Sequence, residues 1–230
     1  MKQILISQIT PRTEPVVFGA AYSVYVRAVR LALAEKGVPY RLEEVDIFAD
    51  GGPPPGYLER HPFARIPAFE HDGFRLYEAT AISLYIDGAF EGPPLMPGGA
   101  RAEVRARARV HQLLGILDNY AYRTLVWDVF VERVSVPQEG GTPDEAKIAA
   151  ALERARICLA AVESLMGAGP WLAGARVSLA DLRAFPMFEL FRKAPEGARL
   201  LAGYPGLARW FEAMAARASA MATRPPIEET

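Results

Sequence analysis

Three groups that can bind a small peptide lie close together between residues 61 and 82 of this sequence. Pro67 begins an apolar run and has no N–H, so it suits a sheet edge, a strand start or a cis turn, and it leaves the Ile66 amide free for a ligand. A helix begins near Ala79, and the unpaired amides of a helix N-terminus attract a carboxylate. Glu78, just before that helix, can hold an ammonium. Together the three groups suit a zwitterionic peptide.

A β-hairpin and the helix that follows it must position these groups. The apolar runs 66–69 and 74–77 flank Asp72-Gly73, a pair that tolerates the positive φ of a tight turn. After the hairpin, apolar residues recur at helical spacing: Ile82, Tyr85, Ile86, Ala89 and Phe90. We therefore expect a hairpin that leads directly into a helix.

The residues before the hairpin predict a βαβ unit. Residues 15–18 form a short apolar run typical of a buried strand, and a helical pattern runs from Tyr22 to Lys36-Gly37, where glycine suits the helix end. A second strand is expected over 40–47, and a short helical connection near 57–60. The predicted order is βαβαββα, with a parallel, right-handed first unit.

Composition excludes several classes of protein. Lys and Arg (26) nearly balance Asp and Glu (27), which argues against nucleic acid or an anionic membrane as a partner. No apolar run reaches membrane-spanning length, and residues 3–9 are too short and polar for a signal peptide. Cys158 is the single cysteine, so we expect no internal disulfide and a cytoplasmic location. His61, His71 and His111 lack metal-ligand spacing, so no metal is expected.

The second half of the sequence predicts an all-helical domain. A Pro/Gly-rich stretch at 91–100 breaks all periodicity and predicts a linker. Thr142 and Ser178 are expected to cap helices, each with an acidic residue three positions later, and a last amphipathic helix follows Pro205. Two apolar stripes are expected to face the core: Val110, Leu113, Leu114, Leu117 and Ala121, then Ile148, Leu152, Ala155, Leu159, Val162 and Met166.

This order, together with three short motifs, resembles the glutathione transferases. Residues 23–31 are similar to that family's serine-containing loop and first helix, Arg65-Ile66-Pro67 resembles its Val-Pro turn, and 78–82 resembles its Glu-Ser-x-Ala-Ile motif. The chain is identified as a bacterial, serine-type, cytosolic member. The resemblance implies an N-terminal extension (1–14), a thioredoxin-like glutathione-binding domain (15–90), a linker (91–100) and an all-helical domain (101–230).

The resemblance implies that Ser23 is the catalytic residue. A hydroxyl donor at a helix N-terminus lowers the pKa of a thiol, ordinarily about 8.5, by favouring the thiolate. The alternative is that Ser23 only caps the first helix. Tyr22 and Tyr25 are rival donors, although the family's tyrosine types place that hydroxyl where this chain has Phe18. Thiol-disulfide exchange is excluded, because this loop has no cysteine.

The resemblance also implies how glutathione is held. Glu78 pairs with the γ-glutamyl ammonium, and the amides of Ala79 and Thr80 receive its carboxylate. The chain departs from the family at Ala79, where Ser or Thr is usual, and at His61, where Asn is frequent. The complete expected set of glutathione-binding residues is His61, Arg65, Ile66, Pro67, Glu78, Ala79 and Thr80.

We expect a glutathione transferase that directs the glutathione thiolate at a soft, hydrophobic electrophile, with glutathione as co-substrate. Isomerase, peroxidase and dehalogenase reactions remain open within that class. The second-substrate site is expected at Tyr25, His111, Gly115 and Tyr122. Core or dimer contacts are the alternative for Tyr122, as for Tyr120 and Trp127. A homodimer is expected. The competing hypothesis is a noncatalytic binding or regulatory module with this fold.

Overall fold

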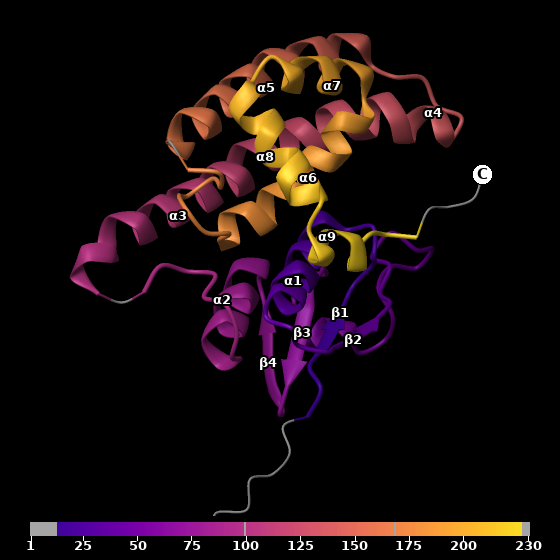
Figure 1. Ribbon diagram of the computed structural model, residues 1–230. Coiled ribbons are helices and arrows are strands. Elements are labelled where there is room, and N and C mark those ends of the chain that lie inside the picture. The colour runs from indigo at the N-terminus through magenta and orange to yellow at the C-terminus, as the bar shows by residue number, and fades with distance from the viewer. Residues whose placement is uncertain (1–12, 99, 168, 227–230) are drawn as a thin grey trace, which may run out of the picture.

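The computed structural model describes residues 13–98, 100–167 and 169–226 (Figure 1). A small sheet with two helices comes first, and the rest of the described chain is helical. This confirms the predicted α/β part followed by an all-α part. Most of the predicted N-terminal extension, residues 1–12, lies outside the described residues.

The sheet confirms the predicted βαβ unit and hairpin. Strands β1 (Val16–Phe18) and β2 (Arg41–Glu43) are parallel and are joined by helix α1 (Val24–Glu35). Strand β3 (Ala68–His71) pairs antiparallel with β1 and with β4 (Phe74–Tyr77). Within the described residues the strand order is β2-β1-β3-β4, so β4 is an edge strand.

The hairpin turn has the conformation that its sequence predicts. Asp72 and Gly73 have φ of +51° and +76°, the positive values of a two-residue primed turn. One other prediction was too generous, because strand β2 is shorter than the predicted 40–47. The short helical connection expected near 57–60 is confirmed as the 3₁₀ turn η1 (Tyr57–Glu59).

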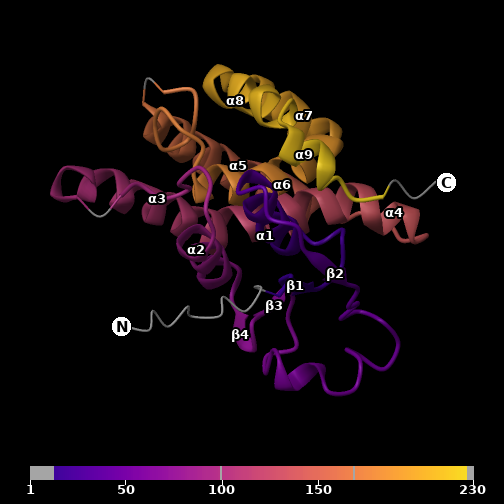
Figure 2. The same ribbon diagram turned by 60° about the horizontal axis from the view of Figure 1, so that its bottom comes forward.

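Helix α1 lies between the sheet and the helical part (Figures 1 and 2). It packs on α2 (Ala79–Ala89) from one side and on α6 (Leu179–Lys193) from the other. Buried apolar side chains of β1, α1, α2 and α6, such as Val17 and Phe185, belong to one continuous core. The two parts of the chain therefore share a hydrophobic core.

The helical part begins with η2 (Arg101–Glu103) and α3 (Val104–Ile116), followed by the π-helical segment η3 (Leu117–Ser135) and the short α4 (Val136–Gln138). The wider winding shows at its end, where the Val136 N–H donates to the Val131 carbonyl five residues earlier. The predicted stripe on this segment is confirmed, since its five members are buried: Val110, Leu113, Leu114, Leu117 and Ala121.

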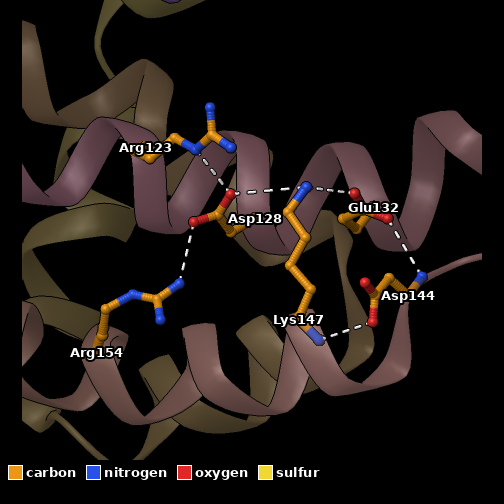
Figure 3. A network of polar contacts seen from close by, with 6 residues as sticks. All are labelled: Arg123, Asp128, Glu132, Asp144, Lys147 and Arg154. Carbon is orange, nitrogen blue, oxygen red and sulfur yellow. Dashed lines mark hydrogen bonds and ion pairs between the residues drawn. The ribbon is translucent and has the colours of Figure 1, made fainter.

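An ion-pair network joins η3 to α5 (Glu145–Met166) (Figure 3). Asp128 accepts from Arg123 Nε at 2.8 Å and from Arg154 Nη2 at 3.1 Å. Lys147 Nζ lies 3.8 Å from Asp128 Oδ1 and donates to Glu132 at 2.5 Å. The buried carboxylate of Asp128 is thus surrounded by three cations from the two helices.

The start of α5 corrects one predicted cap. Asp144, not Thr142, is the N-cap residue, and its carboxylate accepts from the Lys147 amide at 2.9 Å. The second predicted cap is confirmed. Asp181 Oδ2 accepts from the Ser178 amide at 2.8 Å and hydroxyl at 2.7 Å. Its Oδ1 receives the Leu172 amide and the Trp210 indole, so all four donors meet one buried carboxylate.

The chain continues through α7 (Pro195–Ala202) and the predicted helix after Pro205, α8 (Pro205–Ala215). A further short helix, α9 (Ala218–Ala222), was not predicted and lies against α1. No helix in the described ranges combines the length and the apolar character needed to cross a membrane.

Candidate active site

Ser23 is the N-cap residue of α1. Its backbone is extended, with φ of −68° and ψ of 128°, and its hydroxyl oxygen accepts from the Val26 amide at 3.4 Å. That distance is long for a hydrogen bond, so the cap is weak. Because the oxygen is the acceptor in this bond, the hydroxyl proton stays available for another acceptor. Ser23 therefore caps α1 through its oxygen, and this bond does not use its hydroxyl proton.

Gly19 brings the Ser23 loop against the proline turn. Its φ is +153°, and a Cβ there would lie 3.1 Å from Ile66 Cβ and would overlap the Val26 side chain. Only glycine allows the end of β1 to approach Ile66 this closely. The N-terminus of α1 and the Ile66-Pro67 turn are consequently neighbours.

The Ile66-Pro67 peptide is cis, one of the three arrangements that the sequence left open. Pro67 is buried immediately before β3. The buried Tyr57 donates its hydroxyl to the Arg65 carbonyl at 2.7 Å. This bond holds the backbone that leads into Ile66.

Glu78 occupies the N-cap position of α2 in a strained conformation. Its φ of +71° is unusual for a residue with a side chain and costs about 1–3 kcal/mol. The side chain is exposed and makes no capping hydrogen bond to its own helix. An exposed carboxylate therefore stands beside the first amides of α2, at Ala79 and Thr80, which have no partner within their own helix. The strain at Glu78 is typical of functional sites.

The hydroxyl of Thr80 is directed to the helical part of the chain. It accepts from Arg183 Nη2 of α6 at 3.1 Å, and Arg183 Nη1 also lies 2.5 Å from Asp118 Oδ1. The Arg183 guanidinium stands 4.9 Å from the centre of the Tyr25 ring. Ala79 is buried and has no side-chain oxygen, so the two residues at the start of α2 differ in what they contribute.

His61 lies among aromatic side chains and close enough to Glu78 to be affected by its charge. Its ring centre is 5.0 Å from that of Tyr77, and the side chain is only 2% exposed. Burial lowers the pKa of His61, nearby Glu78 opposes that shift and Arg65 adds to it. Within the described residues its Nδ1 has no hydrogen-bond partner. Both observations favour the neutral form of His61 over the charged one.

The two tyrosines near Ser23 are engaged elsewhere. The Tyr22 hydroxyl donates to Asp46 at 3.0 Å, and burial and that carboxylate raise the pKa of Tyr22 to about 12. Burial raises the pKa of Tyr25 further, with Asp118 also contributing. A phenol with a raised pKa gives up its proton less readily, so both are weaker donors than an unperturbed tyrosine.

Tyr25 and Tyr122 are brought together, with ring centres 4.7 Å apart in an edge-to-face arrangement. Burial raises the pKa of Tyr122, and a hydrogen bond with Trp127 and the positive charge of Arg65 oppose that rise. His111 and Gly115 belong to α3, where His111 is exposed and the Gly115 carbonyl accepts from Asn119 at 2.8 Å. The contacts found in the described part of the chain do not join His111 to the two tyrosines.

Sequence reasoning missed Arg183 and Tyr57. Arg183 carried a usable signal, because it is a charged residue in an otherwise apolar stretch of α6 and is 3% exposed. Tyr57 carried none, since its partner is a backbone carbonyl. The described residues contain no group of three or more His, Cys, Asp or Glu that could hold a metal ion.

Comparison with known proteins identifies relatives along most of the chain. Residues 17–94 match the family "Glutathione S-transferase, N-terminal domain", and residues 145–213 match "Glutathione S-transferase, C-terminal domain". "Probable glutathione S-transferase GSTF1" of Oryza sativa subsp. japonica is 31% identical over 88% of this chain and 92% of its own. "Glutathione S-transferase F13" of Arabidopsis thaliana is 28% identical over 90% and 94% of the two chains.

Solved structures with a similar fold are also named glutathione transferases. Glutathione transferase F7 from Populus trichocarpa has a TM-score of 0.79 and 27% identity, over 91% of this chain and 97% of that one. A structure titled glutathione S-transferase-I bound with the ligand lactoylglutathione has a TM-score of 0.81 and 25% identity, over 92% and 99%. The relatives named here are plant proteins where a source is given, so they do not support the expected bacterial origin.

Proposed function

Because this chain belongs to the glutathione S-transferase family, we propose that its Ser23 hydroxyl activates the thiol of glutathione for attack on a hydrophobic electrophile. The chain is a glutathione-dependent transferase, because relatives that match it over nearly their whole length are named glutathione S-transferases. The observation that carries the serine assignment is the position of Ser23 at the start of α1, with a weak cap and beside the Ile66-Pro67 turn.

The proposed chemistry needs only a hydrogen-bond donor. The Ser23 hydroxyl donates to the glutathione sulfur, and the N-terminus of α1 adds a favourable field, so the thiolate is stabilised relative to the thiol. Bringing the thiolate and the electrophile together in one cleft supplies the rest of the rate enhancement. In this scheme no residue of the chain forms a covalent bond to substrate.

The remaining site residues are proposed to hold the tripeptide. Glu78 binds the γ-glutamyl ammonium, and the first amides of α2, at Ala79 and Thr80, bind its carboxylate. The backbone at Ile66, fixed by the turn at Pro67, pairs with the cysteinyl segment. Arg65 is proposed to meet the glycyl carboxylate, with His61 beneath it. The exposure and strain of Glu78 support this arrangement.

For the electrophile we propose the surface formed by Tyr25 and Tyr122, which pack together across the two parts of the chain. Their rings offer an apolar surface close to the start of α1. His111 and Gly115 complete the proposed set at its α3 side, with less support from the contacts. Conjugation is the reaction we propose, and isomerase, peroxidase or dehalogenase activity would use the same thiolate.

We also propose a homodimer, because the edge strand β4 and the loop before β3 expose aromatic side chains. Phe63 of that loop is 68% exposed, and Phe74 and Tyr77 of β4 are 50% and 38% exposed. A strand that forms the edge of the described sheet and carries apolar side chains favours association. We also propose a cytoplasmic location, which the single cysteine favours. The proposed residue bounds of the two domains are 15–90 and 101–230, and the two matched family domains favour this division.

The test is calorimetry with glutathione together with a conjugation assay on the wild type and Ser23→Ala. We expect both proteins to bind glutathione, while kcat/KM of Ser23→Ala falls about tenfold to a hundredfold, the effect of losing one hydrogen bond to a charged group. Ser164→Ala is the matched control, because Ser164 donates to a backbone carbonyl on the exposed side of α5. Absence of any heat of binding in the wild type would instead favour a noncatalytic module, which the missing hydroxyl at Ala79 also favours.

A further inference from the structure

Arg183 is a buried cation that links both parts of the chain. Its side chain is 3% exposed, and it contacts Asp118 at 2.5 Å, the Thr80 hydroxyl at 3.1 Å and the face of Tyr25 at 4.9 Å. A buried guanidinium is costly unless its N–H groups are paired. Nη1 and Nη2 are paired with Asp118 and Thr80, and Nε has no partner within the described residues, so the two Nη contacts constrain its position. Arg183 therefore fixes the relative positions of α6, η3, α1 and α2 at one point.

Thr80 connects Arg183 to the proposed glutathione site. It is the second residue of α2, and its amide is one of those assigned above to the γ-glutamyl carboxylate. The Thr80 hydroxyl is held by a residue that is 103 positions away in sequence. A first turn anchored by its side chain keeps its amides in place before the ligand arrives, which reduces the cost of binding.

Ala79 explains why such an anchor is useful in this chain. A serine or threonine at this position would supply a hydroxyl of its own, but alanine supplies none, and the residue is 6% exposed. Losing one hydrogen bond weakens binding about threefold to tenfold. The Arg183–Thr80 bond offers a different way to keep the same turn effective.

We infer that Arg183 is a positioning residue of the glutathione site, which acts through the Thr80 hydroxyl and offsets the missing hydroxyl at Ala79. This inference rests on the proposed function. Arg183 does not contact glutathione in this scheme. It sets the first turn of α2 relative to Tyr25 and Asp118.

The closing experiment measures glutathione KM, kcat and the free energy of unfolding for Thr80→Val, which removes the hydroxyl and keeps the shape of the side chain. We expect the glutathione KM to rise about threefold to tenfold while kcat changes less than about twofold. Thr223→Val is the matched control, since the Thr223 hydroxyl is buried and donates to the Ser219 carbonyl of α9, and Thr223 is not among the proposed site residues. It should lose similar stability and keep the wild-type KM.

A rescue variant separates positioning from general damage. In the double variant Ala79→Ser with Thr80→Val, the new hydroxyl should restore the glutathione KM to within about twofold of wild type. If Arg183→Met folds, its glutathione KM is expected to equal that of Thr80→Val. If it does not fold, the Thr80→Val measurement still tests the inference. An unchanged KM in Thr80→Val, or a double variant as weak as Thr80→Val alone, overturns the inference. A wild-type chain that does not bind glutathione overturns the proposed function itself and the inference with it.

Discussion

The Tyr57 hydroxyl donates to the Arg65 carbonyl, with 2.7 Å between the two oxygen atoms. Tyr57 is 3% exposed and packs with Val45 and Ala68 in a small second core. Since its position is fixed by packing, the hydrogen bond fixes the peptide between Arg65 and Ile66. The backbone proposed to pair with glutathione is therefore held from inside the protein.

Tyr57→Phe should weaken glutathione binding without unfolding the protein. The ring still fills the small core, but the Arg65 carbonyl loses its donor, so we expect the glutathione KM to rise about twofold to fivefold with kcat nearly unchanged. Steady-state kinetics check this. Tyr204→Phe is the control, because Tyr204 donates to the Arg156 carbonyl at 3.0 Å on the helical part. Equal KM values in the two variants would contradict the role given to Tyr57.

His61 should make the stability of the protein depend on pH. Burial holds the pKa of His61 below its unfolded-state value, with Glu78 opposing and Arg65 adding to the shift. Below about pH 6.5 the unfolded chain therefore binds more protons, and stability falls as the pH decreases. In His61→Asn we expect the free energy of unfolding to change less between about pH 7 and 5 than in the wild type.

Urea unfolding at both pH values checks the His61 prediction. His111→Asn is the control, because His111 is exposed on α3. The prediction fails if His61→Asn keeps the full wild-type dependence, or if His111→Asn removes it.

Asp128→Ala should destabilise the helical part. The variant leaves Arg123, Arg154 and Lys147 without their shared carboxylate (Figure 3), and the Asp128 side chain is 8% exposed. The Arg123 side chain is 67% exposed and that of Arg154 is 49% exposed. We therefore expect the free energy of unfolding to fall by about 1–3 kcal/mol, less than for a fully buried pair. Glu153→Ala is the control, since its pair with Arg156 is exposed. Thermal unfolding of the two variants should differ clearly, and equal melting temperatures would contradict the prediction.

Glu35→Gln should detach the C-terminal helix α9 from α1. Arg217 donates to both Glu35 oxygens at 2.6 Å, and the Ser219 hydroxyl lies 2.5 Å away. Burial alone would raise the pKa of Glu35, but these hydrogen bonds outweigh it and lower the pKa. The carboxylate therefore stabilises the fold above its unfolded pKa of about 4.3, and that contribution is lost as the pH falls through the lower folded value.

We expect Glu35→Gln to lose about 1–2 kcal/mol at neutral pH, and the difference from wild type to shrink below about pH 4. Urea unfolding across this range is the measurement. Glu43→Gln should be nearly silent, because its partner Arg41 is exposed. A difference that grows as the pH falls would show the opposite sign and reject the assignment.

Features that depend on neighbours in sequence were predicted correctly. The Asp72-Gly73 turn, the helix that starts at Ala79, the Ser178–Asp181 capping box and the apolar stripe of α3 and η3 follow from turn chemistry and periodicity. Where two local signals competed, the prediction failed by a small shift. Asp144 and Thr142 are both good N-cap residues, and the contact of Lys147 with η3 places the helix start at the later one.

The candidate site also contains both features that depend on neighbours in sequence and contacts between distant elements. Ser23, the Ile66-Pro67 turn and Glu78 could be found in the sequence, because each depends on a helix start or a turn within a few residues, although their roles stay predictions. The sequence could not show that the Thr80 hydroxyl meets Arg183 or that Tyr57 reaches Arg65. Those contacts depend on how distant elements pack, since a hydrogen bond forms only when folding brings donor and acceptor within about 3 Å. The order of residues set the local turns and caps, whereas the distant partners of buried polar groups such as Thr80 and Tyr57 were decided by the tertiary structure alone.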